Sequence, residues 1–298
     1  MKKHYTKHIK NGQKIESSFI INKIISKKDG DTVALIGDKT GDIKAYFKDK
    51  NNICKVGNII VFKGTFSENF KCEVVKKIDS FDLYEYLPSV ERPIEEIMNE
   101  LESITKNEFK SKEAIELNNY FFKNPEFLSK FKKGIGGIYQ HHNYIGGLAE
   151  HTLNVTYLAK ILSYRYDCRY KEIAILSAKL HDIGKIKELF FEGPFKYTLQ
   201  GDMEGHIVIG INMLEEAFKA NPTIYSEDFK TRIKACVVQH HGKIEFGSPR
   251  DMKTEEAFIV HYSDYLDATL NKISIIKKNV PLGTWSDYDR RIEGKLYL

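Results

Sequence analysis

The chain changes its hydrophobic periodicity once, at a proline-containing segment near residue 90. Before it, short runs rich in Ile, Val, Phe and Thr alternate with polar or glycine-containing turns, which is typical of strands. After it, apolar residues recur at spacings of three and four, as on one face of a helix. The segment 86–93 carries two of the seven prolines and is interpreted as a linker. We therefore predict a β-rich domain over 1–85 and an α-helical domain over 94–298.

The β-rich part has the size of a small barrel. Its five runs are 18–26, 31–36, 42–47, 58–66 and 71–78. Five short strands in about 75 residues match an OB-fold. Strand alternation places three side chains of the third run on one face, and we predict them as nucleic-acid contacts: Lys44, Tyr46 and Lys48. Further candidates for a binding groove are Lys63, Phe66, Phe70 and Lys71, although about half of the aromatic residues are expected to fill the barrel core instead, and the sequence does not say which half.

The positive charge of the chain lies in its first third. The formal net charge is +5, and residues 1–90 hold 17 basic and 11 acidic side chains, whereas the rest of the chain holds 29 and 30. This asymmetry indicates a module that binds a polyanion, joined to a nearly neutral module. Solvated surface lysines are the alternative explanation of the same excess.

The second part of the chain reads as an all-α domain. The periodic stretches are 94–106, 112–122, 125–131, 148–164, 171–182, 207–218, 226–239 and 253–272. The predicted fold class is thus multidomain, a small N-terminal β-barrel followed by a helical domain.

Membrane and secreted classes are disfavoured. No stretch reaches the ~18 apolar residues of a membrane span, and the first residues, MKKHYTKHIKNGQK, lack the apolar region of a secretory signal. The four cysteines are widely spaced and form no CxxC pair. We expect a cytoplasmic protein with no membrane partner.

Histidines are concentrated in the helical domain, where eight of the ten fall between His141 and His261. His181-Asp182 ends the apolar run IAILSAKL, and an ionisable pair at the end of a core helix needs partners. Imidazole and carboxylate are ligands of divalent metals, and the absence of cysteine from these motifs disfavours a structural zinc site. Because a carboxylate can bridge two ions, and two ions ~3.5–4 Å apart promote phosphoryl displacement, a two-metal site is one reading.

The order of these residues resembles a known superfamily. The series His151, His181-Asp182 and Asp264 is similar to the HD superfamily of metal-dependent phosphohydrolases, and the added His206 and His240-His241 resemble its two-metal branch. More narrowly, five motifs resemble the YhaM family of 3′→5′ exoribonucleases, which also carries an N-terminal OB-fold: GIYQHHNYIGGLAEHT, LHDIGKIKE, GDMEGHIVIG, HHGKIEFGSP and EEAFIVHYSDYLDA.

The resemblance implies two divalent metal ions per chain. The implied first-metal ligands are His151, His181, Asp182 and Asp264, and the implied second-metal ligands are Asp182 as the bridge, His206, His240 and His241. The family favours Mn²⁺, although these ligand types also admit Fe²⁺, Co²⁺, Mg²⁺ and Zn²⁺. Asp267 is interpreted as a supporting acid rather than a ligand.

The implied activity is hydrolysis of single-stranded RNA from its 3′ end to nucleoside monophosphates, by a water activated between the two metals. Asp182 and Lys185 are the predicted catalytic residues, with Lys185 stabilising phosphate or leaving-group charge. His142 and Asn143, which precede Gly146-Gly147, are predicted substrate contacts.

The residues leave alternatives open. Single-stranded DNA is an alternative substrate, and a phosphodiesterase of short oligonucleotides or cyclic dinucleotides is an alternative activity. A nucleic-acid-binding regulator with a structural HD site is the alternative of another class. A symmetric homo-oligomer is a common outcome that the sequence leaves undecided.

Overall fold

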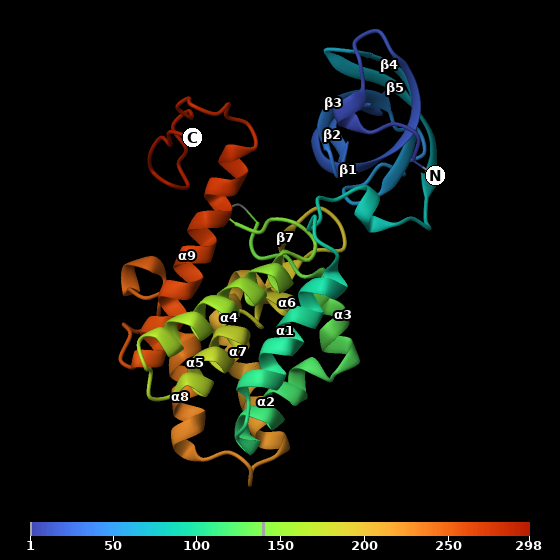
Figure 1. Cartoon of the computed structure of the whole chain (residues 1–298). Helices are drawn as coiled ribbons and strands as arrows, with labels where there is room; N and C mark the ends of the chain where they lie inside the picture. The colour runs from blue at the N-terminus through green and yellow to red at the C-terminus, as the bar shows by residue number, and fades with distance from the viewer. Residues whose placement is uncertain (1, 139–140) are drawn as a thin grey trace. The chain divides into compact units, whose positions relative to one another are not determined.

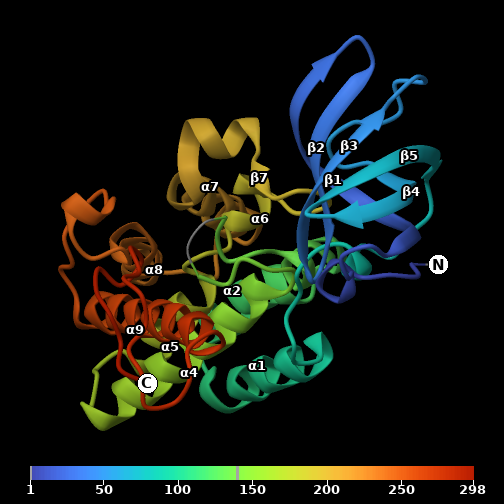
Figure 2. The ribbon, with the colours of Figure 1, turned by 90° about the horizontal axis from the view of Figure 1, so that it is seen from above.

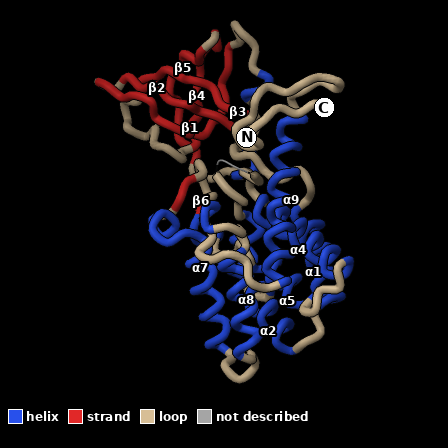
Figure 3. Tube along the Cα trace, turned by 90° about the vertical axis from the view of Figure 1, so that its left-hand side faces the viewer, coloured by secondary structure: helices blue, strands red, loops and turns tan. Residues whose placement is uncertain are grey.

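The computed structural model describes residues 2–138 and 141–298, so Met1 and the motif residues Tyr139 and Gln140 lie outside the described chain. Contacts divide the chain into two units, Met1–Ser89 with Phe190–Lys196, and Val90–Leu189 with Tyr197–Leu298. The five long strands belong to the first unit and the long helices to the second (Figures 1 and 3). No sequence pattern indicated that 190–196 belongs with the barrel. The predicted domain limits, 1–85 and 94–298, stay a prediction about independent folding.

The first unit is a closed five-stranded barrel with the order β1-β2-β3-β5-β4 (Figure 2). Its strands are β1 Lys14–Lys28, β2 Asp31–Asp38, β3 Gly41–Lys48, β4 Ile59–Ser67 and β5 Asn69–Ile78, flanked by the single turns of 3₁₀ helix Thr6–His8 and Leu83–Glu85. The barrel closes because β3 pairs in parallel with β5, whereas the other pairs are antiparallel. The predicted small barrel is confirmed, and β1 begins earlier than the apolar run indicated.

Alternation along the strands sorts the side chains of the barrel. In β3, Ala45 and Phe47 are buried, Lys44 and Lys48 are exposed and Tyr46 is half-buried. The predicted common face of Lys44, Tyr46 and Lys48 is therefore confirmed. The inclusion of Phe70 among the groove candidates was wrong, because its ring is fully buried and packs edge-on against Phe19 with centroids 6.2 Å apart. Aromatic residues of a small barrel fill its interior before they serve a ligand.

The second unit is helical. Its helices are α1 Ile94–Glu108, α2 Lys112–Phe122, α3 Pro125–Lys133, α4 Gly147–Arg165, α5 Lys171–Leu180, α6 Lys185–Glu188, α7 Leu199–Ala220, α8 Glu227–Gln239 and α9 Glu255–Lys277. Between α6 and α7 in the chain, two short strands pair, β6 Leu189–Phe190 and β7 Lys196–Tyr197, and the segment Phe190–Lys196 within them belongs to the first unit. Every periodic stretch predicted as a helix corresponds to one, although α5 ends at Leu180 rather than at 182 and α9 begins at Glu255 rather than at 253. Among the described residues, the structure contains no helix with the length and apolar character needed to cross a membrane.

Helix α5 occupies the middle of the helical unit. It contacts α2, α4, α8 and α9, and Figure 2 shows α4, α5 and α9 next to one another. From Ile173 to Leu180 its residues are all buried, because apolar or small side chains surround the whole helix. The chain leaves this helix at His181-Asp182, so the fold delivers an ionisable pair to the interior.

Lys179 is the one charged residue within that buried helical stretch. Its side chain is only 3% exposed. The Nζ donates hydrogen bonds to Thr105 Oγ1 at 2.6 Å and to Asn118 Oδ1 at 2.7 Å, and it lies 3.8 Å from the ring centroid of Phe122. Burial lowers the pKa of Lys179 to about 7. Folding therefore removes a proton from this amine at pH values where the unfolded chain keeps it.

This shift predicts a pH-dependent stability difference between the native protein and Lys179→Met. The unfolded state binds more protons between pH 7 and 10.5, so the native free energy of unfolding rises with pH across that window. Relative to Lys179→Met, we expect a gain of about 1.4 kcal/mol per pH unit at most. Urea denaturation of both proteins at pH 7 and pH 9 measures it. A difference that stays constant between the two pH values contradicts the assignment.

Candidate metal centre

Five helices of the second unit each contribute to one buried cluster. His151 comes from α4 and Asp264 from α9, while His206 comes from α7. The two adjacent pairs, His181-Asp182 and His240-His241, immediately follow α5 and α8. The structure thus brings together all seven residues that the sequence motifs single out as ligand types.

Four of these side chains form a first group around one carboxylate oxygen. Asp182 Oδ2 lies 3.4 Å from His151 Nε2 and 3.3 Å from His181 Nε2. Asp264 Oδ1 lies 3.2 Å from His151 Nε2 and 4.0 Å from His181 Nε2. Two imidazole nitrogens and two carboxylate oxygens therefore converge on a single small volume.

The other oxygen of Asp182 faces a second group. Asp182 Oδ1 lies 3.6 Å from His206 Nε2 and 3.7 Å from His240 Nε2. His206, His240 and His241 also offer three ligand atoms within 4.8 Å of one another. Asp182 consequently stands between the two groups, with one oxygen directed to each.

Backbone carbonyls fix the orientation of two of the rings. His181 Nδ1 donates a hydrogen bond to Ala178 O, and His240 Nδ1 donates one to Val237 O, each at 2.7 Å. Both acceptors lie one helical turn before the histidine, because each histidine immediately follows the last turn of its helix. With Nδ1 as the donor, Nε2 is the unprotonated nitrogen and is directed toward the cluster.

Carboxylates orient two further rings. His151 Nδ1 donates to Asp267 Oδ2 at 2.6 Å, and His206 Nδ1 donates to Glu188 Oε1 at 3.1 Å. Glu188 also accepts the backbone N–H of His206 at 3.0 Å. A carboxylate behind an imidazole fixes the tautomer and makes the other ring nitrogen more basic, as in known metal sites.

Unsatisfied buried atoms show that the cluster suits a divalent cation. Asp182 Oδ1, His206 Nε2, His240 Nε2 and His241 Nδ1 are buried and have no hydrogen-bond partner among the described residues. Burying a polar atom without a partner is costly, and native structures rarely tolerate several together. Imidazole nitrogens and carboxylate oxygens are the donors that divalent transition metals accept. The residues present therefore fit a metal ion.

Electrostatics keep Asp182, His240 and His241 in their metal-binding forms, whereas the carboxylates of Asp182, Asp264 and Asp267 outweigh burial and raise the pKa of His151 well above its usual value. Burial acts to raise the pKa of Asp182, but Lys185 and His181 outweigh it, so the pKa lies well below the usual value and the carboxyl stays ionised. Burial, together with its neighbour His241, holds the pKa of His240 well below the usual range. Burial also lowers the pKa of His241 to about 4. Neutral imidazoles and ionised carboxylates are the metal-binding forms.

Two glycines permit the backbone geometry of this cluster. A Cβ on Gly184 would lie 2.0 Å from His206 O, so only glycine lets the start of α6 approach α7 this closely. Gly205 has φ 71° and ψ 158°, a conformation that interrupts α7 just before His206. Both glycines belong to the sequence motifs, and both act by placing His206 beside Asp182.

Lys185 lies against the cluster, and its predicted catalytic role stays a prediction. Its Nζ forms an ion pair with Asp182 Oδ2, and the side chain is 9% exposed. Burial acts to lower the pKa of Lys185, but the carboxylate of Asp182 outweighs it and raises the pKa above the usual value. The side chain is thus a cation held at the metal centre.

The predicted substrate contacts in the helical unit lie behind the cluster. His142 is 1% exposed, and its Nε2 donates to Asp267 Oδ2 at 2.8 Å. Asn154 Nδ2 donates to Asp267 Oδ1 at 2.8 Å. These contacts hold Asp267 against His151, and they agree with the interpretation of Asp267 as a supporting acid. Asn143 donates to a backbone carbonyl, and its Oδ1 is buried without a partner. Substrate contact by His142 and Asn143 stays a prediction.

The predicted contacts of the barrel belong to the other unit. Lys44 Nζ lies 5.3 Å from the ring centroid of Tyr46, and Lys48 pairs with Asp31 at 3.6 Å. Lys48 and Asp31 are both mostly exposed, so this ion pair contributes little to stability. The two lysines and the tyrosine form one basic, aromatic strip on β3.

Sequence reasoning missed two residues of the cluster. Glu188 orients His206 and is the last residue of the motif LHDIGKIKE, so its place in that motif could have indicated a role at the site. His141 has both ring nitrogens buried without a partner, and it offers a ligand atom within 4.8 Å of atoms from His151 and Asp264. Its place next to His142 in the first motif was the only hint, and adjacency alone does not say which of two histidines faces a site.

The contact between Asp267 and His151 carries a prediction. Asp267→Asn retains the size of the side chain but removes its charge, so we expect the first group to bind a divalent metal about 10–100-fold more weakly. Titration of the chelator-treated full chain with Mn²⁺ or Co²⁺ measures this affinity. Asp251→Asn, an exposed aspartate outside the network, is the control. Equal affinity of Asp267→Asn and the native chain contradicts the orienting role.

Comparison with known proteins agrees with this geometry. The family model named HD domain matches residues 148–269. The chain is 28% identical over 277 residues to the 3′-5′ exoribonuclease YhaM of Geobacillus sp. (strain WCH70), covering 88% of this chain and 83% of the relative. It is 26% identical over 277 residues to the protein of the same name from Bacillus subtilis (strain 168), covering 88% and 86%.

A solved structure also matches, the HD domain of the phosphodiesterase PgpH of L. monocytogenes. The identity is 19%, the match covers 49% of this chain and 74% of that chain, and the TM-score is 0.28. A likeness at that score supports no conclusion about this chain.

The histidine–aspartate cluster and its surrounding helices define an HD-domain protein, here preceded by a β-barrel. Within that class the chain is similar to the two exoribonucleases named YhaM, which align with 88% of it at 26–28% identity.

Proposed function

We propose that this protein is a metal-dependent 3′→5′ exoribonuclease that hydrolyses single-stranded RNA to nucleoside monophosphates. Two relatives that carry the name 3′-5′ exoribonuclease align with 88% of the chain. The matched HD domain contains the histidine–aspartate cluster. Hydrolysis of a phosphodiester is the chemistry that this cluster supports best.

The observation that carries the proposal is the position of Asp182. Its two oxygens face two groups of imidazole nitrogens, and its Oδ1, together with one ring nitrogen each of His206, His240 and His241, lacks any hydrogen-bond partner among the described residues. We assign His151, His181, Asp182 and Asp264 to a first ion and Asp182, His206, His240 and His241 to a second. Two divalent cations held there would supply a nucleophile at neutral pH and charge stabilisation for an in-line displacement at phosphorus. We propose Mn²⁺ as the preferred ion.

Other residues of the chain orient the ligand side chains and supply positive charge. Asp267 and Glu188 hold the rings of His151 and His206 in one tautomer and one direction. Lys185 supplies a fixed ammonium at the edge of the cluster, where a nonbridging or leaving oxygen of the substrate gains a charge partner. Because the cluster is buried among five helices, these charges act in a medium that screens them less than water does.

The barrel is proposed to hold the single strand. The basic strip of Lys44, Tyr46 and Lys48 offers two phosphate partners and one ring for a base. We further propose a cytoplasmic location, and single-stranded DNA as a second substrate of the same site.

The direction and product of cleavage test the proposal. Single-stranded RNA labelled at its 5′ end should give a ladder that shortens one nucleotide at a time, whereas the same RNA labelled at its 3′ end should release labelled mononucleotide from the first cycle. Addition of a chelator should stop both, and Mn²⁺ should restore them. Internal cleavage, or hydrolysis of cyclic dinucleotides with no action on RNA, overturns the assignment.

A further inference from the structure

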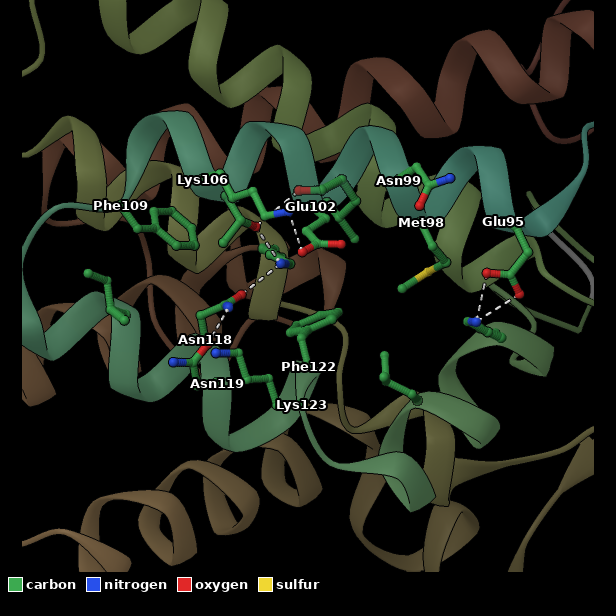
Figure 4. A pocket seen from close by; sticks show the side chains of 16 residues that line it. Glu95, Met98, Asn99, Glu102, Lys106, Phe109, Asn118, Asn119, Phe122 and Lys123 are labelled. Carbon is green, nitrogen blue, oxygen red and sulfur yellow. Dashed lines mark hydrogen bonds and ion pairs between the residues drawn. The ribbon is translucent and has the colours of Figure 1, made fainter.

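A cavity of about 470 Å³ lies in the helical unit, formed by α1, α2, α3 and Lys179 of α5. Figure 4 shows its lining side chains, which come from α1 to α3 except for Lys179, a residue of the helix that His181-Asp182 follow. The volume falls within the range of pockets that bind small molecules. None of the predicted site residues lines it, so its polar groups have no assigned role.

The charges of this cavity do not cancel. Lys106 pairs with Glu102 at 2.8 Å, and Lys132 pairs with Glu95 at 2.8 Å, which accounts for both acids of the lining. The remaining two lysines, Lys123 and Lys179, have no carboxylate within ion-pair distance in the described part of the chain. Lys123 is therefore an unpaired cation of the lining, and Lys179, with a pKa of about 7, adds partial positive charge near neutral pH, which favours an anionic ligand.

The rest of the lining suits a flat ring that carries polar edges. Phe109 and Phe122 stand beside the Lys179 amine, with centroids 6.0 and 3.8 Å from Nζ. Asn118 Nδ2 donates to Asn119 Oδ1 at 3.5 Å, which leaves the amide N–H₂ of Asn119 to donate elsewhere. Aromatic faces stack on nucleobases, and side-chain amides recognise their hydrogen-bonding edges.

We propose that this cavity binds a nucleoside 5′-monophosphate, with the phosphate at the basic groups and the base between the aromatic and amide side chains. A mononucleotide combines an anionic phosphate, a flat ring and a polar edge, which match the basic, aromatic and amide side chains of the lining. The inference does not require nuclease activity, although the proposed function would supply this ligand as its product. It is a second site, on the side of α5 away from the metal centre, because Lys179 and His181 are two residues and about 200° apart around the helix.

Calorimetric titration of the full-length, metal-loaded protein with AMP, GMP, CMP and UMP tests the proposal. Lys123 is exposed and has no ion-pair partner among described residues, so Lys123→Glu should fold normally and weaken nucleotide binding about tenfold or more. Lys110→Glu, an equal change outside the lining, should bind as the native chain does. RNA hydrolysis by Lys123→Glu without added nucleotide should be unchanged.

Two further readouts locate the site and identify the ligand. Bound nucleotide should slow backbone hydrogen exchange in 94–123, and Phe122→Leu should weaken binding with little change in the charge of the cavity. Equal affinity for the nucleotide in the native chain and Lys123→Glu overturns the proposal. Nucleotide binding that is lost in Asp182→Asn but retained in Lys123→Glu also overturns it, because the nucleotide would then bind at the metal centre. Inorganic phosphate that binds as tightly as any mononucleotide also overturns it, because the base would then contribute nothing.

Discussion

Asp182→Ala is expected to lower RNA hydrolysis by about 10³-fold or more, because both oxygens of this carboxylate are needed to position two charges. Each oxygen lies within 3.7 Å of ring nitrogens from a different group, so one substitution disables both groups. We expect metal content, measured by mass spectrometry after desalting, to fall for both ions. His206→Ala should instead leave the first ion largely in place and still remove most of the activity.

The buried neighbours of Asp182 make a control for folding necessary. Without the carboxylate, Lys185 would be left as an unpaired buried cation, which itself destabilises the fold. Asp182→Asn keeps the volume of the side chain and one oxygen, so it should fold more stably and still lose most activity. Asp202→Ala, an exposed aspartate of α7, should behave as the native chain. Retention of two metal ions per chain in Asp182→Ala would falsify the bridging role.

Part of the cluster could be predicted from residue types at helix ends, and the full set of seven ligand-type residues followed from the family resemblance. His181-Asp182 and His240-His241 each follow an apolar run, and a polar pair in that position has to find partners inside. What a single sequence cannot contain is the pairing between distant elements, such as Asp267 with His151.

Local conformations that break a periodic pattern were also beyond the sequence. Helix α7 was predicted from 207, because residues 199–204 are mostly polar and show no apolar stripe. The helix starts at Leu199 and is interrupted at Gly205, a break that periodicity cannot detect. Likewise, Lys179 lies within an apolar run of the sequence, and that run does not indicate a ligand site. Only the fold shows that Lys179 lines a cavity between α1 and α2.

The strip on β3 carries the second large expected effect. Lys44 and Lys48 are exposed, and Tyr46 lies between them on the same face of the strand. Each lysine that neutralises a phosphate of a single strand releases condensed counterion, with a slope of about −0.7 in log K against log salt. A stacked base adds about 1–3 kcal/mol through the ring. Loss of a phosphate contact therefore changes the salt dependence of binding, whereas loss of a stacked base changes the affinity without changing that dependence.

Replacing both lysines by glutamine is expected to reduce the salt slope for long single-stranded RNA by about 1.4. Tyr46→Ala should weaken binding by about 1–3 kcal/mol and leave the slope unchanged. Together the three changes should cost about 100-fold or more in affinity for a long strand at low salt. Fluorescence anisotropy of the full-length protein with labelled RNA, held with a chelator to prevent cleavage, measures both quantities across a salt series.

A matched change elsewhere on the barrel tests whether RNA binds specifically to the β3 strip or only to the net positive charge of the barrel. Lys55→Gln with Lys76→Gln removes the same charge from exposed positions outside β3, so a smaller change in slope is expected there. Hydrolysis of a dinucleotide should respond to none of these variants, since the metal-ligand residues all lie in the helical unit. An equal loss in both lysine pairs would mean that the barrel attracts RNA only through its net charge. An unchanged affinity in the triple variant would mean that β3 does not contact the strand, and that the helical unit alone recognises the substrate.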